Sequence, residues 1–151
     1  MQKVMITKKQ GELHVILIDT SVLIDYTKGT ISEKTDTLDI ISKNNWPFGI
    51  SVYTYQEVLR GARDESEFNT LNTYLLDQRI YYLPNDASVY EKTARVYFNL
   101  RKHGIALNSP IDIFIALTAT HYGLLLLHND KDFIKMEPFM DNLQFFGDTK
   151  F

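Results

Sequence analysis

The chain of 151 residues contains no cysteine, which excludes a disulfide framework and thiolate chemistry and suits a reducing compartment. It has no apolar run close to the roughly 18 residues that a membrane span requires. Its polar first segment, MQKVMITKKQGE, lacks the apolar region of a signal peptide. Internal repeats, low-complexity tracts and linkers are absent as well. We therefore expect a cytoplasmic protein with no membrane partner.

The sequence also lacks an excess of positive charge, because 16 basic residues stand against 19 acidic ones and the net charge is -3 with neutral histidines. This disfavours a protein that coats nucleic acid through bulk electrostatics. A nucleic-acid enzyme is still compatible, if acids gather at a metal site and basic side chains line its rim. The alternative of scattered, solvated charges stays open. The candidates for such a rim are Arg60, Arg63, Arg95, Arg101 and Lys102.

What is present is an alternation of apolar runs and helical patterns, in a chain that is 44% hydrophobic. The expected strands are residues 13–18, 47–51, 80–84, 124–129 and 143–146. The expected helices are residues 20–28, 32–44, a segment around Glu57 that ends near Gly61, 66–78, 86–103 and 109–123. This order predicts an α/β fold in one domain, residues 1–151, with helices on both faces of a mostly parallel sheet. Residues 1–12 are expected to add a β-hairpin with Gly11 in its turn.

Acidic residues follow three of the expected strands and open an expected helix. Asp19 closes the run LHVILI, Glu57 comes one helical turn after FGIS, and Asp112 lies in the first turn of a helix. Asp130 and Asp132 follow LLLLHN. In parallel α/β sheets, ligands bind beyond the carboxyl ends of the strands, which share one edge. Ionised carboxylates gathered there repel one another unless divalent cations offset their charge, so the pattern predicts a metal site.

Each acid also has a simpler explanation when it is considered alone. Asp19 suits a helix N-cap, Asp112 suits the positive end of a helix dipole, and Asp130 and Asp132 suit a turn. The metal hypothesis gains its weight from the shared edge. Mg²⁺ or Mn²⁺ fits these oxygen donors better than Zn²⁺, because no thiolate is present and the four histidines show no zinc-like pairing. His128, two residues before Asp130, is expected to support the site through a hydrogen bond.

Four motifs carry these acids in order along the chain: IDTSVLIDYTKG with Asp19, ISVYTYQEVLRG with Glu57, RKHGIALNSPIDIFIALTA with Asp112, and LLLLHNDKDF with Asp130. In this order and at these spacings they resemble the PIN-domain family, and specifically the VapC-type toxins of bacterial toxin–antitoxin pairs. The resemblance covers about residues 17–146 and implies a three-layer α/β/α fold. It also implies a Mg²⁺- or Mn²⁺-dependent endoribonuclease in which these four acids hold the metal.

The resemblance extends to residues around the acids. Thr20, Ser21 and Thr54 match small hydroxyl positions that hold water, a phosphate oxygen or a metal ligand. Asp132 fits the fourth motif, either on the metal or as a residue that orients the loop. Arg101 begins an Arg-x-x-Gly segment, where it binds an RNA phosphate or forms a structural ion pair. The implied partners are an RNA substrate, a VapB-like antitoxin and a second copy of the chain. Aromatic residues available for such an interface include Tyr53, Tyr55, Tyr97 and Phe98.

The chain departs from the family pattern in its first twelve residues and at His128, where the family often has Ser or Thr. Among rival classes, a haloacid-dehalogenase-like phosphatase requires an acid at position 21, where this chain has Ser21. A receiver-like signalling module requires paired acids near the N-terminus, which are missing. A non-catalytic PIN-like module that binds RNA or protein stays open as the alternative, and so does a DNA nuclease.

Overall fold

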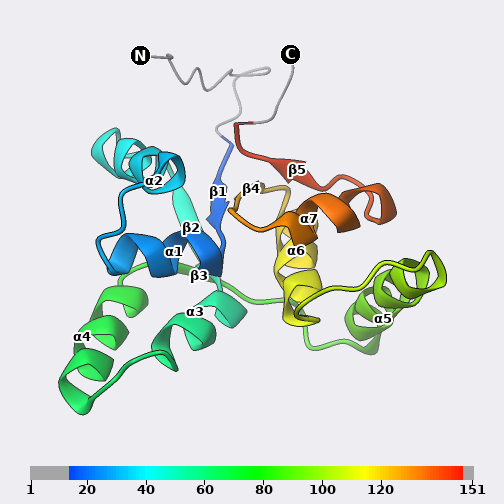
Figure 1. Cartoon of the computed structure of the whole chain (residues 1–151), viewed down its shortest axis with the longest axis horizontal. Coiled ribbons are helices and arrows are strands. Elements are labelled where there is room, and N and C mark those ends of the chain that lie inside the picture. Colours follow the sequence, from blue (N-terminus) through cyan, green and yellow to red (C-terminus); the bar gives the residue numbers. More distant parts are fainter. Residues whose placement is uncertain (1–13, 148–151) are drawn as a thin grey trace.

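The computed structural model describes residues 14–147, so the hairpin expected for residues 1–12 lies outside the described residues. One five-stranded sheet runs through this part of the chain in the order β3-β2-β1-β4-β5, and every adjacent pair is parallel (Figure 1). The predicted α/β class with a mostly parallel sheet is thereby confirmed. The strands are β1 Ile16–Ile18, β2 Phe48–Ser51, β3 Arg79–Tyr81, β4 Leu125–Leu127 and β5 Gln144–Phe145.

Six of the helices within residues 14–147 begin and end close to the expected positions. The α-helices are α1 Thr20–Thr27, α2 Glu33–Lys43, α3 Val52–Leu59, α4 Glu65–Leu76, α5 Ala87–Lys102, α6 Ile111–Tyr122 and α7 Lys131–Met136, and η1 Glu137–Phe139 is a 3-10 turn. The Ser32 and Asp86 side chains accept backbone N–H bonds at the starts of α2 and α5, while Gly123 ends α6 in the left-handed region. No helix within residues 14–147 is long and apolar enough to cross a membrane.

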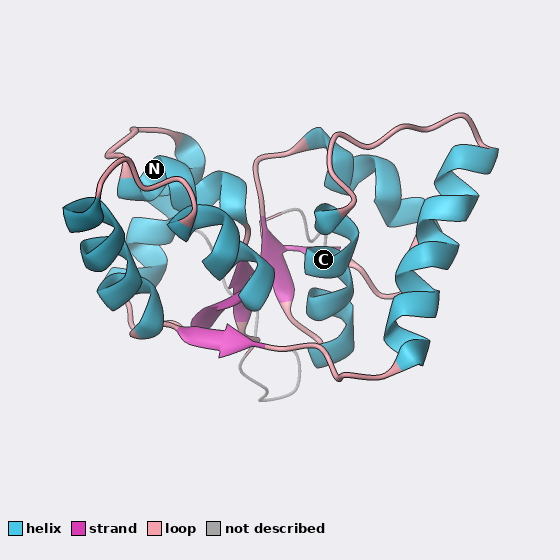
Figure 2. Ribbon diagram, turned by 90° about the horizontal axis from the view of Figure 1, so that it is seen from below, coloured by secondary structure: helices cyan, strands magenta, loops and turns pink. Residues whose placement is uncertain are grey.

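Two hydrophobic cores lie on opposite faces of the sheet. In β1, Ile16 and Ile18 belong to one core and Leu17 to the other, as expected for a strand that is buried on both faces. Helices α1 to α4 supply buried side chains to the first core, and α5, α6 and α7 supply them to the second. Figure 2 shows these two helical layers on either side of the strands. This arrangement is the predicted three-layer architecture.

Two sequence expectations about the segment around Asp130 were wrong. The strand expected for residues 124–129 is confined to Leu125–Leu127, because the chain then turns through His128 and Asn129 into α7. Helix α7 itself was not expected, since the Asp130–Asp132 segment suited a turn. In the structure, Asp130 caps α7 and Asp132 lies in its first turn. The main consequence is that Asp132 is carried by a helix and points back toward α6.

Gly49 allows β2 and β3 to pair closely. A Cβ atom at position 49 would lie 2.5 Å from the carbonyl oxygen of Arg79 and 2.7 Å from Cε2 of Tyr81. Because backbone has to move to relieve this overlap, Gly49→Ala is expected to lower the free energy of unfolding by about 2–3 kcal/mol in urea denaturation. Gly61→Ala is the matched control, since a Cβ atom at position 61 would lie 3.3 Å from its nearest neighbour, the carbonyl oxygen of Val58. Equal stability of the Gly49→Ala and Gly61→Ala proteins would contradict the expectation.

Candidate metal centre

The acidic side chains converge at the carboxyl edge of the three central strands. Asp19 follows β1 and caps α1, Glu57 lies on α3 after β2, and Asp130 caps α7 after β4. Asp112 lies in the first turn of α6, with its side chain turned to the same edge. Asp19, Asp112 and Asp132 are buried, with exposed fractions of 2%, 8% and 1%. Carboxylates that are both buried and close together need charge compensation.

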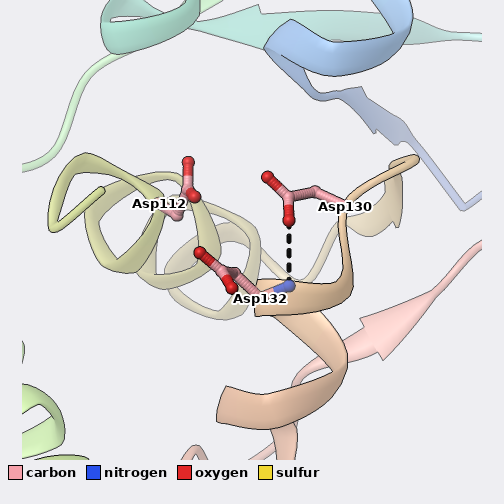
Figure 3. Close-up of side chains that lie close together, drawn as sticks. All are labelled: Asp112, Asp130 and Asp132. Atoms are coloured by element: carbon pink, nitrogen blue, oxygen red, sulfur yellow. Dashed lines mark hydrogen bonds between the residues drawn. The ribbon is translucent and has the colours of Figure 1, made fainter. Parts of the chain in front are cut away.

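Three of these acids meet directly. Asp112, Asp130 and Asp132 each offer a carboxylate oxygen, and these oxygens lie within 4.8 Å of one another (Figure 3). The Asp132 backbone N–H donates to Oδ1 of Asp130 at 2.9 Å, which fixes the orientation of that carboxylate. Carboxylate oxygens in this number and spacing are the ligands that hard divalent cations prefer. The structure thus gives Asp132 a more central place than its sequence context indicated.

Asp19 contributes an oxygen that lacks a donor. Its Oδ2 accepts hydrogen bonds from the backbone N–H of Ser21 at 3.0 Å and from the Ser21 hydroxyl at 2.5 Å. Its Oδ1 is buried and has no hydrogen-bond partner among the described residues. An unsatisfied buried acceptor costs about 1–3 kcal/mol. A cation at this edge would satisfy that oxygen, so the donor set of this chain fits a divalent metal ion.

The electrostatics connect all five acids through Asp112. Burial raises the pKa of Asp112 to about 7, with further contributions from Asp19, Asp130, Glu57 and Asp132. Burial also raises the pKa of Asp19 to about 6, and the charge of Glu57 adds to this although hydrogen bonds from Ser21 oppose it. Each acid named in the sequence analysis therefore lies within electrostatic reach of Asp112. A bound cation would reverse these shifts, because it favours the ionised carboxylates.

A series of hydrogen-bonded hydroxyl groups leads to the Glu57 carboxylate and holds it in place. Thr20 Oγ1 lies 2.8 Å from Oε1 of Glu57 and 3.0 Å from Oγ1 of Thr54, which in turn lies 3.3 Å from Oγ of Ser51. An ionised carboxylate can only accept, so the single Thr20 proton points to Glu57 and Thr54 supplies the proton of the other contact. Ser51 is fully buried and was not predicted from the sequence. Its position as the N-cap of α3 was the available signal.

Removing the Thr20 hydroxyl is expected to weaken metal binding. Thr20→Val keeps the shape of the side chain but leaves Glu57 without its donor, and loss of such a supporting bond typically costs 10–100-fold in metal affinity. Calorimetric titration of the purified protein with Mn²⁺ measures this change, and Thr20→Ser should restore the wild-type value. Thr37→Val is a matched control, because the Thr37 hydroxyl bonds only a carbonyl of its own helix. Wild-type Mn²⁺ affinity in Thr20→Val would remove Thr20 from the site.

The loop that carries Asp130 is held from two sides. The Asn129 backbone N–H donates to the Ser21 hydroxyl at 3.0 Å, which joins this loop to α1. The Asp130 backbone N–H donates to Nδ1 of His128 at 3.2 Å. The imidazole of His128 is buried and packs against the rings of Phe133 and Phe145, with centroids 5.0 and 4.5 Å away. Ser21 and His128 therefore hold this loop in place, and Ser21 also binds Asp19.

Of the basic residues expected at the rim, the structure places Arg60 beside a site acid and gives Arg63 and Arg101 contacts elsewhere. Arg101 is exposed near the end of α5 with its guanidinium over the Tyr97 ring, and none of the ion pairs within residues 14–147 includes it. Arg63 pairs with Glu67 at 2.9 Å. Arg60 does approach the site, 3.9 Å from Glu57. Lys135, which was not predicted, lies 3.3 Å from Asp132.

A parallel α/β fold with buried carboxylates beyond the ends of its central strands defines a class of domains built to hold divalent cations at that edge. The model of the PIN domain family matches residues 16–137, and the chain belongs to this family. The predicted membership is thereby confirmed.

Individual relatives agree with this assignment. Ribonuclease VapC4 of Mycobacterium tuberculosis is 35% identical over 125 residues, which cover 80% of this chain and 89% of that protein. Ribonuclease VapC1 of Methanocaldococcus jannaschii is 29% identical over 133 residues, covering 87% and 88%. Among solved structures, VapBC2 from Rickettsia felis bound to a promoter DNA fragment superposes with a TM-score of 0.64 at 16% identity, covering 87% of this chain and 96% of that one. This last likeness shows the shared fold.

Proposed function

We propose that this chain is a metal-dependent endoribonuclease and the toxin of a VapBC-type toxin–antitoxin pair. The observation that carries the proposal is the convergence of four other carboxylates on Asp112, together with a buried oxygen of Asp19 that has no hydrogen-bond partner among the described residues. Buried carboxylates crowded in this way are unfavourable in the folded chain without a cation, and together they can bind one. The relatives named as ribonucleases, which match most of the chain, supply the reaction class. The whole chain, residues 1–151, is proposed to form one nuclease domain in the cytoplasm.

The residues of the site divide into ligands and supports. Asp19, Glu57, Asp112 and Asp130 are the proposed metal ligands, and Mg²⁺ or Mn²⁺ is the proposed ion because both prefer carboxylate oxygens. When bound, such an ion would neutralise charge on the phosphoryl oxygens and activate a water for attack on phosphorus. Asp132 accepts the backbone N–H of Asn108 at 2.7 Å and so fixes the loop that leads into α6.

The supporting residues hold the acids in a fixed geometry before substrate arrives. Thr20 and Thr54 orient Glu57, Ser21 binds Asp19, and His128 holds the backbone of Asp130. Preorganised ligands avoid the cost of rearranging during the reaction. Hydrolysis by this route needs no covalent enzyme intermediate, since water is the nucleophile. The sugar of the substrate is not selected by these acids, so the preference for RNA depends on contacts around them.

The proposed partners are an RNA substrate, a VapB-like antitoxin and a second copy of the chain. The exposed aromatic residues of α5 suit an apolar interface, because Tyr97 and Phe98 are 40% and 48% exposed. Tyr53, by contrast, packs against Phe114 with ring centroids 5.1 Å apart, so it contributes less free surface. An antitoxin that inserted a basic side chain among the acids would compete with the metal.

Incubation of antitoxin-free protein with total RNA tests the proposal. Discrete cleavage products are expected with Mn²⁺ or Mg²⁺ and should disappear in EDTA. A folded protein that binds Mn²⁺ but leaves total RNA intact would overturn the general ribonuclease assignment and favour the non-catalytic module. A matched DNA substrate in the same assay separates a ribonuclease from a nuclease that ignores the sugar.

A further inference from the structure

Two cations are placed in the same way on opposite sides of the acidic site. Arg60 lies three residues after Glu57 at the end of α3, and Lys135 lies three residues after Asp132 in α7. Residues at this spacing lie on the same face of a helix, so each cation is next to a site acid but one turn further from the strand edge. These are the only ion pairs within residues 14–147 that involve an acid of the site.

Neither cation is firmly bound to its acid. The Arg60 side chain is 63% exposed and its Nη2 is 3.9 Å from Glu57, while the Lys135 side chain is 47% exposed and its Nζ is 3.3 Å from Asp132. Strong charge-assisted bonds between such groups are shorter, roughly 2.7–2.9 Å. The acids beneath are much less exposed, at 13% and 1%. Each cation therefore covers the edge of the site and keeps most of its donors free for another anion.

The topology separates the two cations across the site. Glu57 lies on the helix after β2, and Asp132 lies on the helix after β4, with β1 and its Asp19 between them. Neighbouring strands are spaced about 4.8 Å apart, so β2 and β4 lie roughly 10 Å from each other at this edge. Arg60 and Lys135 thus flank the acids from both sides.

Because the chain is negatively charged overall, a polyanionic strand needs local positive charge to approach the site. The chain carries a net charge of -3, and its site concentrates four other acids around Asp112. A polyanionic strand that approaches the site is repelled unless cations lie within a few ångströms of its phosphates. Two loosely held cations beside the acids supply that local attraction without depending on the overall charge.

We propose that Arg60 and Lys135 are substrate-positioning residues that bind phosphates of the RNA strand on either side of the acid cluster. This inference rests on the proposed ribonuclease function and identifies residues that would hold the substrate there. Arg63 has a different role, because it is committed to Glu67 at 2.9 Å on the exposed start of α4. Lys28 is exposed at the end of α1, far along the chain from the acids of α7, and forms none of the ion pairs of the described chain, which makes it a suitable control.

The test compares Arg60→Ala and Lys135→Ala with the controls Arg63→Ala and Lys28→Ala. Steady-state cleavage of a short single-stranded RNA with Mn²⁺ should show KM raised about 5–10-fold in each of the first two variants, with kcat nearly unchanged, as expected for lost ground-state binding. Each lost phosphate contact should reduce the salt dependence of binding by about 0.7 in the log–log slope. Arg60→Lys and Lys135→Arg should restore much of both values, and the controls should match wild type.

Binding is measured separately from cleavage, so that the two proposals can fail independently. Fluorescence anisotropy of the labelled RNA on the Asp112→Asn protein, with and without each cation variant, gives the salt slope without turnover. If the wild-type protein cleaves RNA and all four variants keep its salt slope of RNA binding and its KM, only the positioning role of Arg60 and Lys135 would be overturned. A change confined to Mn²⁺ affinity would overturn it too and make these cations internal counter-charges. If the wild-type protein cleaved no RNA, but Arg60→Ala and Lys135→Ala weakened its RNA binding, the phosphate contacts would be supported and the proposed ribonuclease activity would be rejected.

Discussion

Asp112→Asn is expected to lower metal-dependent RNA cleavage by on the order of 10³-fold, since a metal centre supplies several kcal/mol of transition-state stabilisation and each 1.36 kcal/mol is tenfold in rate. Asp112 is the acid on which the other four act, as the causes of its raised pKa show. Its carboxylate also approaches those of Asp130 and Asp132. Asparagine keeps the size of the side chain but removes its charge, so the loss should be chemical and not structural.

The measurement is initial-rate cleavage of total RNA and of one identified substrate, with Mn²⁺ and with EDTA. Asp77→Asn is a matched control, because Asp77 is an exposed acid at the end of α4. The control should retain wild-type activity, and both variants should give wild-type circular dichroism. Equal cutting by Asp112→Asn and wild type would show that the observed activity belongs to a contaminating nuclease.

The placement of the acids could be predicted because it depends on topology. Apolar runs that alternate with helical patterns indicate a parallel sheet, and the carboxyl ends of parallel strands share an edge. Asp19 directly follows β1, and Glu57 lies in the helix that β2 enters without a loop. Local sequence therefore specifies where these residues lie, even though no contact between them is visible in it.

Helix α7 could not be predicted in the same way. Its six residues make fewer than two turns, which is too short for a periodic pattern to stand out. Asp130, its N-cap, is also a typical turn residue. The position of Asp132 against Asp112, and that of Lys135 beside Asp132, depend on this helix and were missed with it.

The hydrogen-bonded hydroxyl groups next to Glu57 could be predicted only in part from the sequence. Thr20 and Thr54 were expected near the site through the family resemblance, but their contact joins residues 34 positions apart. Contacts of this kind arise from the packing of α1 against α3, and a single sequence carries no signal for them. For Arg101, the motif left an RNA phosphate contact and a structural ion pair open. The structure places its guanidinium over the Tyr97 ring and in none of the ion pairs within residues 14–147, so the RNA contact stays a prediction.

The metal-free protein is expected to lose stability as the pH rises through the neutral range. The pKa of Asp19 is raised from 3.8 to about 6 and that of Asp112 from 3.8 to about 7, so the folded state holds these protons longer than the unfolded chain does. Their contribution to stability is fully present below the unfolded pKa and is lost as the pH rises through the folded pKa. With 1.36 kcal/mol per unit of pKa, Asp112 alone accounts for on the order of 2–4 kcal/mol.

Bound metal should reverse this dependence. Metal ligands must be deprotonated, so affinity rises with pH, and the free energy of binding adds to that of folding. Unfolding by urea should therefore show a stability that falls from about pH 5 to about pH 8 in EDTA and rises over the same range with saturating Mn²⁺. The contrast between the two curves tests the metal centre without any assay of RNA cleavage.

The Asp112→Asn variant isolates the residue responsible. Asparagine does not ionise, so in EDTA the variant should be more stable than wild type by on the order of 2–4 kcal/mol at about pH 8 and nearly equal to it at about pH 4. The difference between the two proteins removes the titration of every other group, including the exposed acids. A difference that stayed constant over this range would mean that Asp112 ionises normally in the folded chain. The burial of Asp112 and the repulsion from the other acids would then be too weak to require a cation, and the case for a metal site at this edge would lose its physical basis.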